Sequence, residues 1–367
     1  MLLSSCGGTS MDGLHVSHAY PFFHRLEVFG DRMTVVSPDS KTLRALTFDG
    51  RELWRRPIVG DPMVGRYDAM HVYVQEDNAV RRLRVTDGAV EKLLDLPTQQ
   101  RFNWDSAKGL VYLTDRRFER NTFQLLDPDS RQPIWQRDDI ESVLHVEGNL
   151  LVVATATREY DSNDRSFTTR DVAVTGLNRR TGDVRWRVAL NHRAGFVQAA
   201  DVPPCLVVID EGAAGGLLCI EPGSGRTLGR RAHETTWGLS YLDVVADGDR
   251  VAFLENIPHS DDAFLRFAAV PSFEVTESLR LAGAEPMLSL HGHHVLVRGL
   301  YRAFCFDRQT GSRRWQRALV GEWTLLNDEI LLSDYDQRRS RARLVMLDLA
   351  SGRERVILAE PANLPGQ

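Results

Sequence analysis

The phrase Leu177-Asn-Arg-Arg-Thr-Gly-Asp-Val-Arg-Trp186 joins the end of an apolar strand to a Thr-Gly turn and places a tryptophan four residues after the glycine. The same order recurs at Phe306-Asp-Arg-Gln-Thr-Gly-Ser-Arg-Arg-Trp315 and, with Asp-Gly in the turn, at Leu46-Thr-Phe-Asp-Gly-Arg-Glu-Leu-Trp54. More altered copies stand at residues 83–88, 125–135, 219–225, 269–273 and 347–352. The copies recur about every 43 residues, a period typical of propeller blades and solenoid units.

A second feature precedes each phrase, a turn followed by a strand of apolar and β-branched residues. Clear copies are Val146-Glu-Gly-Asn-Leu-Leu-Val-Val153 and Ala246-Asp-Gly-Asp-Arg-Val-Ala-Phe-Leu254, and the others stand at residues 29–36, 67–74, 105–113, 201–209, 290–297 and 327–332. Each repeat therefore holds two hairpins, which make the four antiparallel strands of one propeller blade. A helical solenoid would need apolar residues three and four apart over about ten residues, and no stretch sustains that spacing.

The sequence thus predicts an all-β fold, an eight-bladed β-propeller of four-stranded antiparallel blades. Seven blades are the alternative, if the poorly matching copy at 269–273 or the first copy does not form a blade of its own. We expect one propeller domain over residues 24–358, with an N-terminal tail at 1–23 and a C-terminal tail at 359–367. The way in which the ring closes stays open, because residues 14–20 could add a strand to the last blade.

Bulk charge excludes some partners. The formal net charge is −5 and the sequence pI is about 6.1, which argues against nucleic acid or an anionic membrane bound through bulk charge. No apolar run reaches the roughly 18 residues that span a bilayer.

The N-terminus contains Leu3-Ser-Ser-Cys6 followed by Gly7, which resembles a bacterial lipoprotein cleavage box and would make Cys6 the lipidation site. Only two residues precede the match, whereas a complete signal has a charged region and an apolar region of about 7 to 15 residues. Either the start of the sequence cuts into a signal peptide or the match is accidental. The first explanation predicts a periplasmic protein, with a lipid anchor at Cys6, and the second leaves a cytoplasmic location open.

Cys205 and Cys219 lie on two strands joined by Glu211-Gly-Ala-Ala-Gly215. A hairpin centred near residue 212 would place them almost opposite each other, within reach of a disulfide. Two buried free thiols are the alternative.

Neither of two polar clusters predicts a metal site. His291-Gly-His293-His294 occupies a position that is a hairpin turn in the other repeats, and zinc would need further ligands. Asp161-Ser-Asn-Asp164 lacks the glycine and the distal glutamate of an EF-hand loop. We therefore expect no metal and no cofactor.

The repeated phrase resembles that of the pyrroloquinoline-quinone-like β-propeller family, in which Trp follows a Thr-Gly turn by four residues. Trp54, Trp186 and Trp315 keep that spacing, and Trp135 is one residue off relative to Ser130. Family members that oxidise alcohols with the quinone have an adjacent Cys-Cys pair, whereas none of the four cysteines here are adjacent. The resemblance therefore implies the non-enzymatic, BamB-like branch, whose role is to support the assembly of outer-membrane proteins.

The tryptophans fall into two groups. Trp54, Trp135, Trp186 and Trp315 follow the turn, and we expect them to pack one blade against the next. Trp104, Trp237 and Trp323 precede the first hairpin turn of their repeats, where they either crown one surface or are buried against strands.

The middle loops, between the second and third strands, differ most among the repeats. In repeat proteins such insertions gather on one face, which is frequently the binding face, although solvated loops are the alternative. Arginine and aromatic residues, which dominate protein interfaces, occur in several of them, among them the middle loop that we expect over residues 157–170. The predicted partner-binding face comprises Arg116, Arg117, Phe118, Arg158, Tyr160, Asp161, Phe167, Trp237, His259, Asp261, Trp323, Tyr335 and Arg338.

These features favour a monomeric, non-enzymatic interaction scaffold of the bacterial envelope, which binds an outer-membrane assembly complex through one loop-rich face. An immunity protein that neutralises a secreted toxin could use the same face. A quinone- or metal-dependent enzyme and a protein that binds a small ligand in the central channel are further alternatives.

Overall fold

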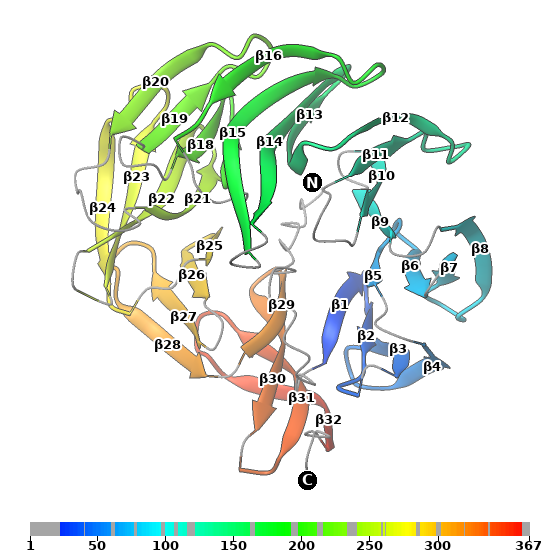
Figure 1. The fold of residues 1–367 in the computed structure, drawn as a ribbon. Coiled ribbons are helices and arrows are strands. Elements are labelled where there is room, and N and C mark those ends of the chain that lie inside the picture. The colour runs from blue at the N-terminus through cyan, green and yellow to red at the C-terminus, as the bar shows by residue number, and fades with distance from the viewer. Residues whose placement is uncertain are drawn as a thin grey trace. The chain divides into compact units, whose positions relative to one another are not determined.

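The computed structural model describes residues 23–361 apart from short gaps, at 40, 60–62, 77–78, 97–99, 106–108, 116–121, 162–165, 192–196, 211–215, 233–240, 258–259, 261, 284–286, 299–301, 319 and 337. The described residues form 32 strands, arranged as eight four-stranded antiparallel sheets of consecutive strands. The protein is therefore an all-β propeller with eight blades (Figure 1), and the predicted fold class is confirmed.

The first four blades comprise sixteen strands. Blade 1 is β1 (His24–Phe29), β2 (Arg32–Val36), β3 (Thr42–Thr47) and β4 (Glu52–Pro57). Blade 2 is β5 (Met63–Arg66), β6 (His71–Glu76), β7 (Ala79–Arg84) and β8 (Val90–Asp95). Blade 3 is β9 (Gln100–Asp105), β10 (Leu110–Asp115), β11 (Phe123–Leu126) and β12 (Pro133–Arg137). Blade 4 is β13 (Ile140–Glu147), β14 (Leu150–Asp161), β15 (Ser166–Asn178) and β16 (Val184–Ala189).

The last four blades follow the same order. Blade 5 is β17 (Ala199–Val202), β18 (Cys205–Asp210), β19 (Gly216–Ile220) and β20 (Thr227–Ala232). Blade 6 is β21 (Tyr241–Asp247), β22 (Arg250–Asn256), β23 (Ala263–Ala269) and β24 (Val275–Leu281). Blade 7 is β25 (Met287–His291), β26 (His294–Arg298), β27 (Arg302–Asp307) and β28 (Arg313–Ala318). Blade 8 is β29 (Val320–Leu326), β30 (Glu329–Asp336), β31 (Arg341–Asp348) and β32 (Glu354–Pro361).

The strands belong to two compact units. The first unit holds residues 1–111, 320–348 and 353–367, and the second holds 112–319 and 349–352. Within each unit, the apolar clusters lie between neighbouring sheets. One cluster joins blades 5 and 6 through Val207 and Phe253, for example, and another joins blades 6 and 7 through Phe267 and Phe304. The second strands are rich in buried apolar residues because both faces of a blade are covered, as in β18, where all six residues are buried.

The recurring tryptophans pack against the glycine turn of the next blade. A Cβ added to Gly88, Gly182, Gly225 or Gly352 would lie 2.5–3.0 Å from Trp54, Trp135, Trp186 or Trp315, respectively. These glycines have φ between +66° and +76°, a left-handed conformation that L side chains rarely adopt. The repeat thus needs glycine for its backbone conformation and for the space above it, and the predicted packing between blades is confirmed.

The indole N–H groups add a polar contact to this packing. Trp54 Nε1 donates to the carbonyl oxygen of Val85 at 2.8 Å, and Trp135 Nε1 donates to that of Arg179 at 2.8 Å. Trp315 Nε1 donates to the carbonyl oxygen of Leu349 at 3.1 Å. Each acceptor belongs to the turn that the ring covers, so one side chain fixes both the distance and the rotation of the next turn.

The last blade packs directly on the first, within the first unit. Their shared apolar cluster includes Phe23, Met33 and Leu344, and Arg355 Nη1 donates to the carbonyl oxygen of Phe48 at 2.7 Å. Blades 1 and 8 each have four strands of their own. Residues 14–20, which we considered as an added strand, lie outside the described residues.

Candidate interaction surface

The order of the strands places the middle turns and the incoming links together. Because the four strands of a blade alternate in direction, the turn between its second and third strands lies at the end where its first strand starts. The turn between the third and fourth strands lies at the opposite end. We call the first of these the middle-turn end.

Blade 4 departs from the other seven at this end. Its β14 and β15 contain 12 and 13 residues, whereas the second and third strands of the other blades contain 4 to 8, from β11 up to β30 and β31. The expectation of a middle loop over residues 157–170 is therefore wrong. Residues 157–161 pair with residues 166–170 in register, and Figure 1 shows β14 and β15 as a long hairpin.

We call residues 157–161 and 166–170 the arm. The pairing of β13 with β14 stops at Thr155, and that of β16 with β15 stops at Ala173. Five residue pairs extend past this level, a length of about 17 Å at roughly 3.4 Å per residue. Within the described part of the chain, the arm is thus a two-stranded ribbon with no flanking strand.

The arm carries four residues of the predicted partner face. Tyr160 pairs with Phe167, Arg158 with Thr169, and Asp161 with Ser166. The strand register therefore brings these positions together near the tip of one hairpin. An irregular loop would not fix which of these residues lie opposite one another.

Blade 8 carries three more of the predicted residues. Tyr335 lies near the end of β30, opposite Ala342, and Arg338 is an exposed turn residue whose backbone N–H donates to Asp336 Oδ1 at 3.1 Å. Trp323 lies within β29, opposite Leu332, and is half-buried. Tyr335 and Arg338 therefore lie at the middle-turn end, while Trp323 is part of the sheet.

The remaining predicted face residues lie outside the described residues, namely Arg116, Arg117, Phe118, Trp237, His259 and Asp261, as does the lipidation candidate Cys6. Trp104, which we grouped with Trp237 and Trp323, lies in β9 and stacks on Tyr67 with 4.6 Å between ring centroids. This contact accounts for Trp104 as a packing residue of the first unit.

Acidic residues on the first strands of several blades form a set of contacts that we did not predict from the sequence. Glu322 Oε2 on β29 accepts the backbone N–H of Leu26 on β1 at 2.8 Å. Asp243 Oδ2 on β21 likewise accepts the backbone N–H of Leu288 on β25 at 2.6 Å. In both cases the acid of one blade satisfies the edge of the next blade, where an unpaired buried N–H would be costly.

Glu27 on β1 belongs to the same set, because its carboxylate accepts the backbone N–H of Arg66 on β5. Burial, and secondly the Glu322 carboxylate, raises the pKa of Glu27 to about 7. Burial also raises the pKa of Asp243 to about 6, against the lowering effect of the N–H groups of Leu288 and Val244. The signal that could have revealed this set is an acid three to five residues before the first turn of a repeat, as in Glu27 before Gly30 and Asp243 before Gly248.

Histidine takes part in one such contact in the second unit. His145 Nδ1 on β13 lies 2.7 Å from Asp201 Oδ2 on β17, and His145 Nε2 lies 3.8 Å from Glu147 Oε2. The hydrogen bond to Asp201 raises the pKa of His145 above its ordinary value, although burial opposes this.

This contact predicts pH-dependent stability. A raised histidine pKa stabilises the fold fully below the unfolded pKa of about 6.5 and loses that effect as the pH rises through the folded value. We expect this pair to contribute at most about 1 kcal/mol to the fall in the free energy of unfolding between pH 6 and 8.5, since Asp201 is half exposed, and Glu27 adds a separate contribution over the same range. Urea titrations of Asp201→Asn should show a smaller fall, and an equal fall in both proteins would exclude the pair as its source.

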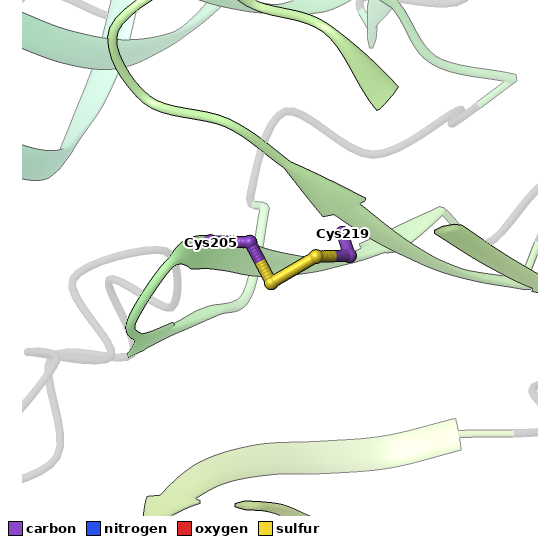
Figure 2. Close-up of a disulfide and its surroundings, with 2 residues drawn as sticks. All are labelled: Cys205 and Cys219. Carbon is purple, nitrogen blue, oxygen red and sulfur yellow. A yellow bond between two sulfur atoms is a disulfide. The ribbon is translucent and has the colours of Figure 1, made fainter. Parts of the chain in front are cut away.

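Cys205 and Cys219 form a disulfide in the structure. Their Sγ atoms are 2.05 Å apart and their Cα atoms 5.5 Å apart, and Figure 2 shows the two side chains directed toward each other. In the register Val207, not Cys205, lies opposite Cys219. The two cysteines are therefore diagonal neighbours on one face of the sheet, which is a closer description than the opposite pair that we expected.

A bond between these cysteines predicts two free thiols, at Cys6 and Cys305, in the denatured and unreduced chain when it is expressed without lipid modification of Cys6. Thiol titration should then give two groups per chain before reduction and four after it. Reduction should lower the free energy of unfolding by about 3 kcal/mol, the typical value for a loop of this size. Four thiols before reduction would contradict the bond, and the double variant Cys205→Ser, Cys219→Ser provides the control that reductant no longer affects.

The histidine cluster forms a turn, as expected. His291 pairs with His294 across the hairpin, and Gly292 has φ +53°. His294 is buried with Nδ1 3.8 Å from Cys305 Sγ. Among the described residues, no group of three or more His, Cys, Asp or Glu side chains is placed to hold a metal ion. The same part of the chain contains no helix of the length and apolar character needed to cross a membrane.

Known proteins resemble this chain in sequence pattern and in fold. A family profile described as outer membrane protein assembly factor BamB matches residues 15–269. No curated protein sequence matches the chain. At identities of 15% or less, the structural likenesses below show the fold alone.

Three solved structures illustrate that fold. BamB from Moraxella catarrhalis has 13% identity and a TM-score of 0.51, with 94% of this chain and 95% of that chain covered. Apo AztD from Citrobacter koseri has 10% identity and a TM-score of 0.53, with 88% and 92% covered. The dihydro-heme d1 dehydrogenase NirN in complex with DHE has 15% identity and a TM-score of 0.55, with 94% and 74% covered. The fold therefore occurs in an enzyme as well as in an assembly factor.

The repeated Trp-on-glycine packing, the eight four-stranded blades and a family match over most of the chain agree with one another, and the protein belongs to the BamB family of pyrroloquinoline-quinone-like β-propellers.

Proposed function

We propose that the protein is a non-enzymatic interaction scaffold of the bacterial envelope, which binds a protein partner at the middle-turn end of its blades. The observation that carries this proposal is the arm. One blade of eight extends its second and third strands past the strands that flank them in the same sheet. An extension that costs chain entropy and has no flanking strand in its own sheet is the kind of feature that serves a role outside the fold.

The composition of the arm favours a protein partner. Its ten residues include Tyr160 and Phe167, two arginines and two acids, so the aromatic and arginine content is high and the net charge is zero. Protein interfaces are enriched in aromatic residues and arginine. Nucleic acids and anionic membranes would need an excess of positive charge, which neither the arm nor the whole chain provides.

Two features support the non-enzymatic part of the proposal. Cys305 is buried, and burial raises the pKa of its thiol to about 12, which makes it a poor nucleophile. The chain also lacks the adjacent cysteines of the quinone enzymes. A location in the envelope is supported by the family match and by the disulfide, since disulfides persist in oxidising compartments. We propose that Cys6 carries the lipid anchor.

An affinity capture from native envelope extracts tests the function. The full chain is the bait, mild crosslinking preserves weak complexes, and mass spectrometry identifies the bound proteins. Components of the outer-membrane assembly machinery are the expected result. A single secreted toxin would instead identify an immunity protein, and the absence of any protein partner would overturn the proposal in favour of ligand binding or catalysis.

A shortened arm is the matched variant for this capture. Replacing residues 158–169 with Asn-Gly joins Thr157 to Arg170, which already pair, and Asn-Gly favours a tight hairpin turn. We expect this variant to lose the partner and to keep the thermal stability of the full chain.

A further inference from the structure

We propose that the outer edge of β14 in the arm binds an extended segment of the partner as an added antiparallel or parallel β-strand. This inference rests on the proposed function, because it specifies how the arm would hold a protein. It concerns the backbone of residues 157–161, and it goes beyond a contact made by side chains.

The orientation of the backbone at this edge follows from a hydrogen bond at the base of the arm. The N–H of Ala156 donates to the carbonyl oxygen of Asp139 at 2.9 Å, on the side of β14 that faces away from β15. Successive residues of a strand point their N–H and C=O groups to opposite sides. The bulge at the base leaves this alternation intact on β14, because its extra residue lies on β15, where Asp171 has φ +53°.

The backbone groups of Arg158 and Tyr160 therefore point to the same side as those of Ala156. Those of Thr157, Glu159 and Asp161 face β15 and form the hairpin. β13 begins at Ile140 and pairs with β14 only as far as Thr155. Within the described residues, the outward N–H and C=O groups of the arm are thus left for a strand that would continue the line of β13.

This edge has few of the features that protect a natural edge strand. Exposed edges are commonly blunted by proline, by charged side chains, above all lysine, or by a very short length. Residues 157–161 contain neither proline nor lysine, and their one positive charge, at Arg158, stands beside two negative charges, at Glu159 and Asp161. A five-residue edge that is left open in this way can pair with another strand.

The chemistry of the edge selects the occupant. Two residues offer alternating donors and acceptors along an extended line, and a polypeptide in the β conformation presents the complementary alternation. Lipids and sugars do not repeat donors and acceptors at this spacing. The near-neutral charge of the arm adds no preference for a polyanion. The occupant is therefore an extended peptide segment, bound mainly through its main chain.

A displayed library of random nine-residue peptides is the probe, with the full protein as target. Peptides enriched on the wild type are then measured by fluorescence anisotropy against two double variants. Arg158→Pro, Tyr160→Pro removes two outward N–H donors, and proline is tolerated where the N–H of an edge strand faces solvent. Arg158→Ala, Tyr160→Ala removes the same side chains and keeps the donors.

We expect the proline variant to bind the enriched peptides at least about tenfold more weakly and the alanine variant to stay within about threefold of the wild type. A peptide N-methylated at alternate residues should bind the wild type about tenfold more weakly when the methyl groups block its pairing edge. This second measurement uses the unaltered protein, so it holds even if proline distorts the arm.

Three results would overturn the edge-pairing inference. These are no enrichment of any peptide, equal loss in the alanine and proline variants, and indifference to N-methylation. Each is distinguishable from failure of the proposed function, which the envelope capture reports separately. If a captured partner bound the proline variant as well as the wild type, the proposed scaffold function would stand and the edge-pairing inference would be wrong.

Discussion

Reversing the charge of Arg116, Arg158 and Arg338 together to glutamate is expected to abolish partner binding, with a loss of about 100-fold or more in affinity. Arg158 lies in the arm and Arg338 is exposed in the middle turn of blade 8. Arg116 lies outside the described residues, in the middle segment of blade 3. The three substitutions change the net charge by −6, and all of them lie in the middle segments of their blades. Acidic groups on the partner would then be repelled where the arginines attracted them.

We expect the thermal stability of this triple variant to equal that of the wild type, because charged side chains outside the apolar clusters contribute little to folding. The control is a second triple reversal, Arg51→Glu, Arg180→Glu and Arg226→Glu, at exposed positions in the turns between third and fourth strands. These turns lie at the other end of each sheet. Binding measured by surface plasmon resonance should be lost only in the first triple. Unchanged binding there would exclude the middle-turn end as the interface.

Replacing Gly225 with alanine is expected to lower the free energy of unfolding by about 3 kcal/mol or more, which corresponds to a fall in Tm of roughly 4 °C or more. Two costs combine at this position. Gly225 has φ +74°, and its Cβ would lie 2.5 Å from Cδ2 of Trp186. The ring cannot move away freely, because Trp186 packs against the apolar cluster between blades 4 and 5.

Gly223 supplies the matched control in the same turn. A Cβ there meets nothing within 4 Å, and its φ is not in the left-handed region. Gly223→Ala should therefore change stability by no more than about 0.5 kcal/mol. Calorimetric scans of the two variants separate the effect of the docked ring from that of losing a glycine. Equal Tm values would show that Trp186 does not constrain the turn.

The candidate site was predictable in part. Counting repeats is enough to place Tyr335 and Arg338 at a middle turn. For the arm residues, the same counting predicts only that they belong to blade 4, and it does not predict that they form strands. Residues 157–170 are polar and irregular in sequence, so neither alternation nor turn residues identify them as strands. Their strand character depends on pairing with each other across the hairpin. That pairing is a property of two segments together.

The acidic residues of the first strands illustrate the same limit. Glu27, Asp243 and Glu322 look like ordinary surface acids in the sequence. Only the packing of one blade beside another half-buries them and brings a backbone N–H to their carboxylates. Burial then raises the pKa of Glu27 and of Asp243, an effect that depends on neighbours from other repeats.

By itself the sequence determined the all-β class, the eight blades and the packing of tryptophan between them, because these rest on local features repeated along the chain. A glycine with positive φ, a Thr-Gly turn and a tryptophan four residues later act within a few residues of one another, and eight copies reinforce the same interpretation. The tertiary structure alone decided the arm, the diagonal geometry of Cys205 and Cys219, and the contacts of the half-buried acids. Each of these depends on the register of paired strands or on the contact between blades, and a shift of one residue in either would reverse which groups face each other.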